Sequence, residues 1–143
     1  MIMMLIYQRG SAMLAENYIN EFTINCSGDV CAGDIIMFER DIFTGHYKNA
    51  KFSHKQKIIA EVLKDSYGAK KQQHTFTLRI IWDSDNSYDK DQNIRIKGRV
   101  LYRNGVLRRK WYDETNRLNV LEDKHLRGNG ARVLRKVLEE IKL

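Results

Sequence analysis

Alternating apolar and polar side chains predict a β-rich central part of the chain. Residues 74–82 show this pattern most clearly, because the side chains at 76, 78, 80 and 82 are apolar and those between them are largely polar. Such alternation is typical of a strand with one buried face. Residues 33–39 begin with Gly-Asp and continue as a β-branched and aromatic run, which predicts a turn into a buried strand. Residues 57–63 favour a further strand.

Residues 94–102 alternate again and place several cations on one face. They predict one or two short strands, with Gly98 marking a bulge and Asn104-Gly105 forming the next turn. Two stretches have no clear period. Residues 40–55 predict a long loop, and residues 83–93 predict a polar, acidic loop.

Helical periodicity is expected at both ends of the chain. In residues 11–22, Ser11 can cap a helix whose apolar side chains recur every four residues. Residues 111–127 also fit one helical face, and the Gly128-Asn129-Gly130 triplet is expected to end that helix. Residues 131–143 predict a second amphipathic helix with these side chains inward: Leu134, Val137, Leu138 and Ile141.

Together these patterns predict an α+β fold: a small antiparallel sheet or open barrel with an N-terminal helix and two C-terminal helices. The length of 143 residues predicts a single domain. We divide it into an N-terminal helix and loop (1–32), a β-rich core (33–107) and the C-terminal helices (108–143).

The net charge of +7 is concentrated in the second half of the chain. Residues 1–60 hold six basic and six acidic side chains, so residues 61–143 carry the whole excess. The segment from Ile94 to Trp111 contains seven Lys and Arg side chains and no Asp or Glu. A basic segment without acids attracts polyanions, so we expect a nucleic acid, DNA or RNA, as the partner.

Other classes of protein fit the composition poorly. Two cysteines cannot form a disulfide scaffold, which favours a reducing compartment. The longest apolar run, Met1 to Tyr7, is too short to cross a bilayer and lacks a basic segment before it. We therefore expect an intracellular protein of the nucleus or cytoplasm, with no membrane partner.

The sequence contains no recognisable catalytic or metal-binding motif. Cys26, Cys31, His46 and His54 miss the usual zinc spacings, which favours two buried or half-buried free thiols. The aspartates of residues 83–93 do not follow the pattern of a calcium-binding EF-hand loop. Nucleophile-elbow and phosphate-loop motifs are absent from the sequence. We therefore predict no catalytic residues, no metal and no cofactor.

The candidate site residues follow the basic segment and a Lys/Gln/His loop at residues 70–74. Lysines and arginines would contact phosphates, and Gln, His and Tyr side chains would contact bases or sugars. Cations near the end of a helix also interact favourably with its dipole, which is the alternative role of the residues at 124–127. The predicted contacts are Lys70, Lys71, Gln72, Gln73, His74, Arg95, Lys97, Arg99, Tyr102, Arg103, Arg108, Arg109, Lys124, His125, Arg127 and Arg132.

Residues 56–135 resemble a domain of plant proteins that also carry a SAP motif and CCCH zinc fingers. The segments that carry the resemblance are GDIIMFE, EVLKDSYGAKKQQHTFTL, IKGRVLYR and RRKWYDETNRLNVLEDKHLRGNGARVLR. SAP motifs and CCCH fingers accompany nucleic-acid binding, so the resemblance implies a nucleic-acid context. This chain has neither accompanying motif, and it has DSDNSYDKDQN where a proline-rich stretch is expected. One hypothesis for such a stand-alone copy is a virus or mobile element that took up a host domain.

Three functions follow from these observations. The first is a nucleic-acid-binding module that uses the basic strand face and the loop at 70–74. The alternative is a protein-interaction or inhibitor module, in which a small barrel binds a peptide or an acidic protein surface. A metal-dependent nuclease using His74, His125 and the acidic loop is the third, so enzymatic activity stays open. A protein partner, or a homodimer through either C-terminal helix, is compatible with the sequence.

Overall fold

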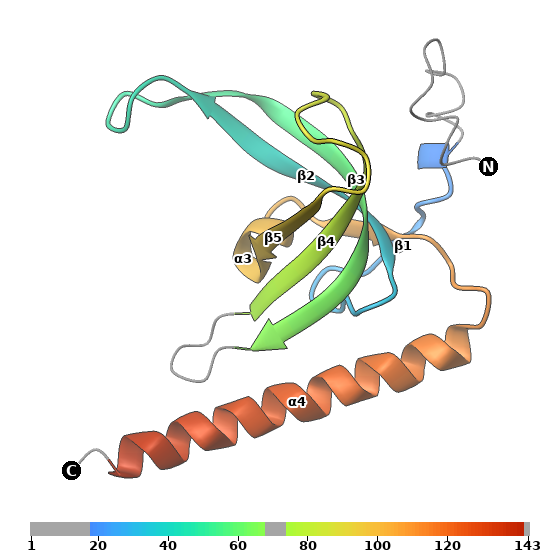
Figure 1. Ribbon diagram of the computed structural model, residues 1–143, viewed down its shortest axis with the longest axis vertical. Helices are drawn as coiled ribbons and strands as arrows, with labels where there is room; N and C mark the ends of the chain where they lie inside the picture. Colours follow the sequence, from blue (N-terminus) through green and yellow to red (C-terminus); the bar gives the residue numbers. More distant parts are fainter. Residues whose placement is uncertain (1–17, 68–73, 142–143) are drawn as a thin grey trace.

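The computed structural model describes residues 18–67 and 74–141, which form an antiparallel sheet and one long helix (Figure 1). Six strands occur in the order β1-β6-β2-β3-β4-β5 across the sheet. The elements are β1 (Ile24–Asn25), β2 (Ile35–Thr44), β3 (Lys51–Tyr67), β4 (His74–Asp83), β5 (Asn93–Lys97), α3 (Gly98–Leu101), β6 (Val106–Arg108) and α4 (Glu114–Ile141).

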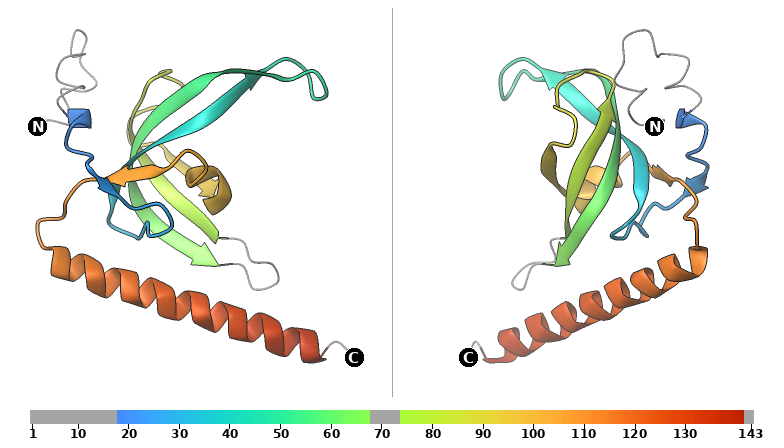
Figure 2. Two further views of the ribbon diagram at one scale, coloured as in Figure 1. Left: turned by 180° about the vertical axis from the view of Figure 1, so that it is seen from behind. Right: turned by 45° about the vertical axis from the view of Figure 1, so that its right-hand side comes forward.

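The sheet is strongly curved, and its concave side encloses the main core (Figure 2). β3 is long and takes part in three register shifts with its neighbours, one against β2 and two against β4. Bulges of this kind increase the local twist and bend a strand. The short helix α3 packs against β2, β4 and β5, so it closes part of the gap between β5 and the other side of the sheet. The core contains Cys26, Val30, Ile36, Phe38, Ile58, Ala60, Val62, Phe76, Leu78, Ile80, Ile96, Leu101 and Val106.

A smaller apolar cluster covers part of the opposite side of the sheet. Tyr18 and Phe22, from the segment before β1, pack there against Ile59 and Ile81. The rings of Tyr18 and Phe22 meet edge to face, with centroids 5.4 Å apart. This cluster explains Ile81, the one apolar side chain that breaks the alternation of residues 74–82. Both faces of the sheet are apolar at that point.

The strands predicted at 33–39, 57–63 and 74–82 are confirmed as parts of β2, β3 and β4. The long loop predicted over residues 40–55 is wrong, because these residues form the outer half of the β2–β3 hairpin. All residues from 43 to 55 are exposed, so neither face is buried and the strands show no alternation. The predicted strand 94–102 also ends early, at Lys97, and Gly98 begins α3 instead of marking a bulge.

The two helices predicted at the C-terminal end of the chain are wrong. A single helix, α4, replaces the two C-terminal helices and continues through Gly128 and Gly130. Each glycine costs a helix only about 1 kcal/mol, and Gly128 is buried on the inner side of α4. At the N-terminal end, Tyr18 and Ile19 are helical, but the chain then turns. Residues 11–17 of the predicted helix lie outside the described residues.

The inner side of α4 is polar, which also contradicts the prediction. Its buried residues are Arg117, Lys124 and Gly128. The apolar side chains that were expected to point inward are instead exposed by 42–71%: Leu134, Val137, Leu138 and Ile141. The helix crosses one end of the curved sheet and is anchored there mainly through charged side chains (Figure 1). In the described part of the chain, none of the helices is both long enough and apolar enough to cross a membrane.

Candidate nucleic-acid interface

The basic segment 94–111 divides into cations that are engaged inside the protein and cations that are exposed at its surface. Arg108 is buried and donates two hydrogen bonds to Glu114, at 2.9 and 2.7 Å. The same interaction holds the pKa of Glu114 down at about 2. Arg109 donates to the Tyr18 hydroxyl at 3.2 Å, and its guanidinium lies over that ring. These two cations therefore fix the chain between β6 and α4.

Arg103 falls between these two groups, because it is exposed but has a carboxylate partner. Its side chain is 67% exposed, and its Nε lies 3.0 Å from a carboxylate oxygen of Asp41. Because water screens the exposed guanidinium, this contact with the half-buried Asp41 contributes only about 1 kcal/mol to stability. Arg103 can therefore exchange this partner for a phosphate at low cost.

Arg95 and Lys97 are exposed side chains of β5. Arg95 lies opposite Thr77 of β4, and Thr77 lies opposite Lys64 of β3. Directly opposed residues of antiparallel strands share one face of the sheet, so these three side chains form a row. A second row, two residues further along each strand, contains Ser66, Thr75 and Lys97.

We call these two rows the basic face. It comprises Lys64, Arg95 and Lys97, with the hydroxyls of Ser66, Thr75 and Thr77 between them. Within residues 18–67 and 74–141, no carboxylate pairs with any of the three cations. Arg99, on α3 just beyond β5, is also exposed and has no carboxylate partner in the same ranges. Ammonium, guanidinium and hydroxyl groups are the usual protein donors to phosphate oxygens.

The cations of α4 have mainly structural partners. Lys124 is 2% exposed, and its Nζ donates to the carbonyl of Val30 at 2.6 Å. Burial lowers the pKa of Lys124, and the nearby carboxylate of Asp65 opposes that shift. Arg127 lies 2.8 Å from the buried carboxylate of Asp65. His125 and Arg132 are exposed, and Arg132 bonds to Asn129 of its own helix.

Asp34 is the centre of the polar contacts that hold α4. Its side chain is fully buried and accepts hydrogen bonds from Arg117 at 2.8 and 2.9 Å. The Trp111 indole donates to it at 2.7 Å, and the backbone N–H of Cys31 donates at 3.1 Å. Arg117 completes the set by donating to the carbonyl of Asp29 at 2.7 Å. The carboxylate thus joins the loop before β2 to the segment before α4 and to α4 itself.

The two predicted base-contacting residues in the described region are partly buried. The pKa of His74 falls to about 4, first because of burial and then because of Lys124, while Asp65 opposes the shift. The Tyr102 hydroxyl accepts a hydrogen bond from the Val30 backbone at 3.2 Å, and its ring meets Phe76 edge to face. Four further predicted contacts lie outside the described residues: Lys70, Lys71, Gln72 and Gln73.

The cysteines and the acidic loop have structural surroundings. Cys26 and Cys31 are free and buried, and burial raises the pKa of each thiol to about 12. Asp83 accepts hydrogen bonds from Gln56 and from the backbone and hydroxyl of Ser87, which shapes the loop after β4. Among the described residues, no group of three His, Cys, Asp or Glu side chains is placed to hold a metal ion.

The groups that a nuclease would need are separated. A strand rises about 3.3 Å per residue, so His74 and Asp83, at the two ends of β4, lie roughly 30 Å apart. His125 is on α4, which crosses the end of the sheet near His74. The acidic loop follows the opposite end of β4.

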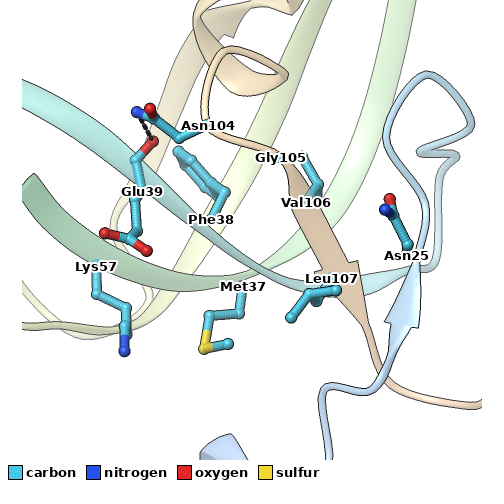
Figure 3. A pocket seen from close by; sticks show the side chains of 9 residues that line it. All are labelled: Asn25, Met37, Phe38, Glu39, Lys57, Asn104, Gly105, Val106 and Leu107. Atoms are coloured by element: carbon cyan, nitrogen blue, oxygen red, sulfur yellow. Dashed lines mark hydrogen bonds between the residues drawn. The ribbon is translucent and has the colours of Figure 1, made fainter.

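Two of the depressions lined by described residues lie near β6, and the sequence patterns indicated neither. One has a volume of about 390 Å³ and is lined by Gly33, Ile35, Arg109, Lys110, Trp111, Tyr112, Asp113 and Asn116. The other, of about 290 Å³, lies beside β2 (Figure 3) and is lined by Asn25, Met37, Phe38, Glu39, Lys57, Asn104, Gly105, Val106 and Leu107. Glu39 and Lys57 lie opposite each other there, so this depression presents both signs of charge.

Sequence reasoning also missed a second basic surface, on the β2–β3 hairpin. Residues 42–60 contain four lysines and no Asp or Glu. The signal was present in the sequence. However, the net charge of residues 1–60 is zero, because Glu39, Asp41 and the other acidic side chains of this stretch offset its lysines and arginines.

Residues 31–111 match the DUF7699 family, which is described as a domain of unknown function. This chain belongs to the DUF7699 family. A relative from Oryza sativa subsp. japonica, zinc finger CCCH domain-containing protein 62, is 38% identical over 126 residues. That alignment covers 83% of this chain but only 18% of the rice protein. No solved structure matches.

These comparisons confirm the plant CCCH part of the resemblance, while a SAP motif is not shown. The DUF7699 match runs from the loop before β2 to Trp111, so it includes β2 to β6 and α3. The basic face and the β2–β3 hairpin both lie inside it. The long helix α4 lies beyond it.

Proposed function

We propose that this DUF7699 chain is a nucleic-acid-binding module whose basic face contacts the phosphate backbone. One observation carries the proposal: Lys64, Arg95 and Lys97 are exposed in two adjacent rows without a carboxylate partner in the described part of the chain. Phosphate contacts by Lys and Arg release counterions and supply most of non-specific affinity. The name of the rice relative, which contains CCCH zinc fingers, adds a nucleic-acid-related context.

The other predicted contacts take different places in the proposal. Arg99 and Arg103 extend the basic face towards α3, because the side chains of both arginines are exposed. Lys70, Lys71, Gln72 and Gln73 lie outside the described residues and stay proposed contacts. Arg108, Arg109, Lys124 and Arg127 act first as structural cations, because their charges are engaged within the protein.

Reversing two charges of the basic face should weaken binding strongly. We expect the double variant Arg95→Glu, Lys97→Glu to lose about 10- to 100-fold in affinity at about 50 mM salt, because two attractive phosphate contacts become repulsive. The measurement is a fluorescence anisotropy titration with labelled single-stranded DNA, double-stranded DNA and double-stranded RNA of equal length.

A matched control separates the basic face from the net charge. Lys110→Glu, Lys136→Glu changes the net charge by the same amount at exposed positions on other elements. We expect this control to lose less than about 3-fold. Equal losses in both double variants would show that only the overall charge matters and would reject the basic face as the site.

The alternative function, a protein-interaction module, is supported by a different surface. The C-terminal half of α4 exposes Val133, Leu134, Val137, Leu138 and Ile141 at helical spacing. Exposed apolar patches often mark contacts with another protein. If the wild-type chain binds none of the three nucleic acids at low salt, this helix face becomes the better-supported contact surface.

A further inference from the structure

The outer half of the β2–β3 hairpin extends away from the rest of the sheet (Figures 1 and 2). We call residues 43–55 the arm. Every residue of the arm is exposed, and cross-strand pairing continues to Thr44 and Lys51. Isolated two-stranded hairpins without a covered face are only marginally stable in water. A protruding ribbon of this length is therefore more easily explained as a binding element than as a structural one.

The arm carries positive charge and no acidic side chain of its own. Lys48, Lys51 and Lys55 lie within it, and none has a carboxylate within ion-pair distance in the described residues. Two acids approach only its base. Asp41 of β2 lies opposite Lys55, and Asp85 lies 2.7 Å from the His54 imidazole. Lys48 and Lys51, nearer the tip, are left to interact with a ligand.

The arm also exposes three large aromatic side chains. Phe43 and Phe52 oppose each other across the ribbon, with ring centroids 6.1 Å apart, and remain 54% and 53% exposed. Their mutual contact stabilises the ribbon by about 0.5–1.5 kcal/mol beyond area burial, which gives them one structural role. Tyr47, at the tip, is 95% exposed and has no comparable role. Three exposed aromatics among lysines therefore need a further explanation.

We propose that the arm binds single-stranded nucleic acid by stacking unpaired bases on Tyr47, Phe43 and Phe52 while Lys48 and Lys51 contact phosphates. Aromatic platforms beside a cationic track are the usual means of holding a single strand, because every base has a π-face. A two-stranded ribbon can also enter the major groove of duplex DNA, where Arg, Lys, Asn and Gln read the base edges. The arm contains no Arg or Gln and one Asn, and the faces of paired bases in a duplex are not open to its aromatic rings, so its chemistry favours the single strand.

This inference rests on the proposed function, and it adds the class of nucleic acid. The basic face alone would bind single and double strands through their backbones. With the arm, the full chain should bind a single-stranded oligonucleotide more tightly than a duplex of equal length. The aromatic side chains of the arm should account for that preference.

The test is an anisotropy titration of the full chain with labelled oligothymidine, oligouridine and a DNA duplex. Loss of one stacked base corresponds to roughly 5- to 150-fold in affinity. We therefore expect Tyr47→Ala and Phe52→Ala each to lose about that much for the single strands and less than about 2-fold for the duplex. Lys48→Ala, Lys51→Ala should lower the salt slope for single strands by about 1.4 units.

Two controls make the result specific. Tyr47→Phe keeps the stacking ring and should bind like the wild type. Tyr112→Ala removes an equally exposed tyrosine outside the arm and should leave affinity unchanged. Thermal unfolding of each variant verifies that the fold is kept. The double variant Lys48→Ala, Lys51→Ala tests the arm without altering the contact between Phe43 and Phe52.

The outcomes distinguish this inference from the proposed function. Wild-type affinity in both aromatic variants, or a wild-type preference for the duplex, would overturn the arm as a single-strand site and leave the basic face standing. Absence of binding to all three ligands would overturn the proposed function as well. Binding of polyglutamate instead of the oligonucleotides, abolished by the same variants, would assign the arm to an acidic protein.

Discussion

Replacing Asp34 by alanine is expected to destabilise the fold by about 3–5 kcal/mol. The carboxylate is completely buried and is the charge partner of Arg117, which is itself 6% exposed. Removal of one partner from a buried pair leaves the other as an uncompensated charge in a low-dielectric environment. The Trp111 indole also loses its hydrogen-bond acceptor.

Urea unfolding followed by tryptophan fluorescence measures this effect. Asp34→Asn should fall near the alanine variant, because the amide does not neutralise Arg117. Asp123→Ala is the matched control, since Asp123 is 69% exposed and pairs with Arg127 of the same helix. It should cost less than about 0.5 kcal/mol. An Asp34→Ala variant within about 1 kcal/mol of the wild type would show that α4 is held mainly by other contacts.

Acidification from about pH 6.5 to about pH 4 is expected to remove about 3 kcal/mol of stability through His74. The pKa of this histidine is about 4 in the folded protein, first because of burial and then because of Lys124 and Arg127, whereas Asp65 opposes the shift. In the unfolded chain its pKa is about 6.5. Between these two values the unfolded state binds the extra proton, so stability falls as the pH is lowered and the loss levels off below pH 4.

His74→Gln cannot take up this proton and should show a flatter dependence of unfolding free energy on pH in the same window. His125→Gln removes an exposed histidine of α4 and should keep the wild-type slope. Measurement of urea unfolding at several pH values between about 4 and 7 compares the three proteins. Identical slopes in the wild type and His74→Gln would contradict the assignment of this acid sensitivity to His74.

Sequence patterns correctly predicted the strands that have one buried face and one solvent-exposed face. Phe76, Leu78 and Ile80 alternate with polar residues because they face the main core, whereas Ile81 and Trp82 pack with a second cluster on the other side of the sheet. The arm has two exposed faces, so its strands left no alternation to detect. In both cases the alternation of apolar and polar residues depends on whether one face of the strand is buried. It therefore indicates a strand only indirectly.

The error in α4 has a similar cause. Periodicity assumes that the apolar face of a helix points inward. Here the inner face carries Arg117 and Lys124, whose partners are Asp34 and the carbonyl of Val30 far away in the sequence. The leucines face outward, and Gly128 fits the buried face.

The same limit applies to the candidate site. Charge patterning found Arg95, Lys97 and Arg99, which the structure leaves exposed. It found Arg108 and Lys124 equally well, although both are buried against internal partners. A run of cations along the chain cannot distinguish these two groups, because the acceptors come from other elements of the fold.

The most direct test of the central claim is the salt dependence of nucleic-acid binding. The logarithm of the association constant is measured against the logarithm of the salt concentration for the wild type and for Lys64→Ala, Arg95→Ala, Lys97→Ala. Each lost phosphate contact lowers the slope by about 0.7–0.9 units, so the triple variant should have a slope smaller by about 2–3 units. An unchanged slope in a folded triple variant would show that the basic face does not contact the phosphate backbone.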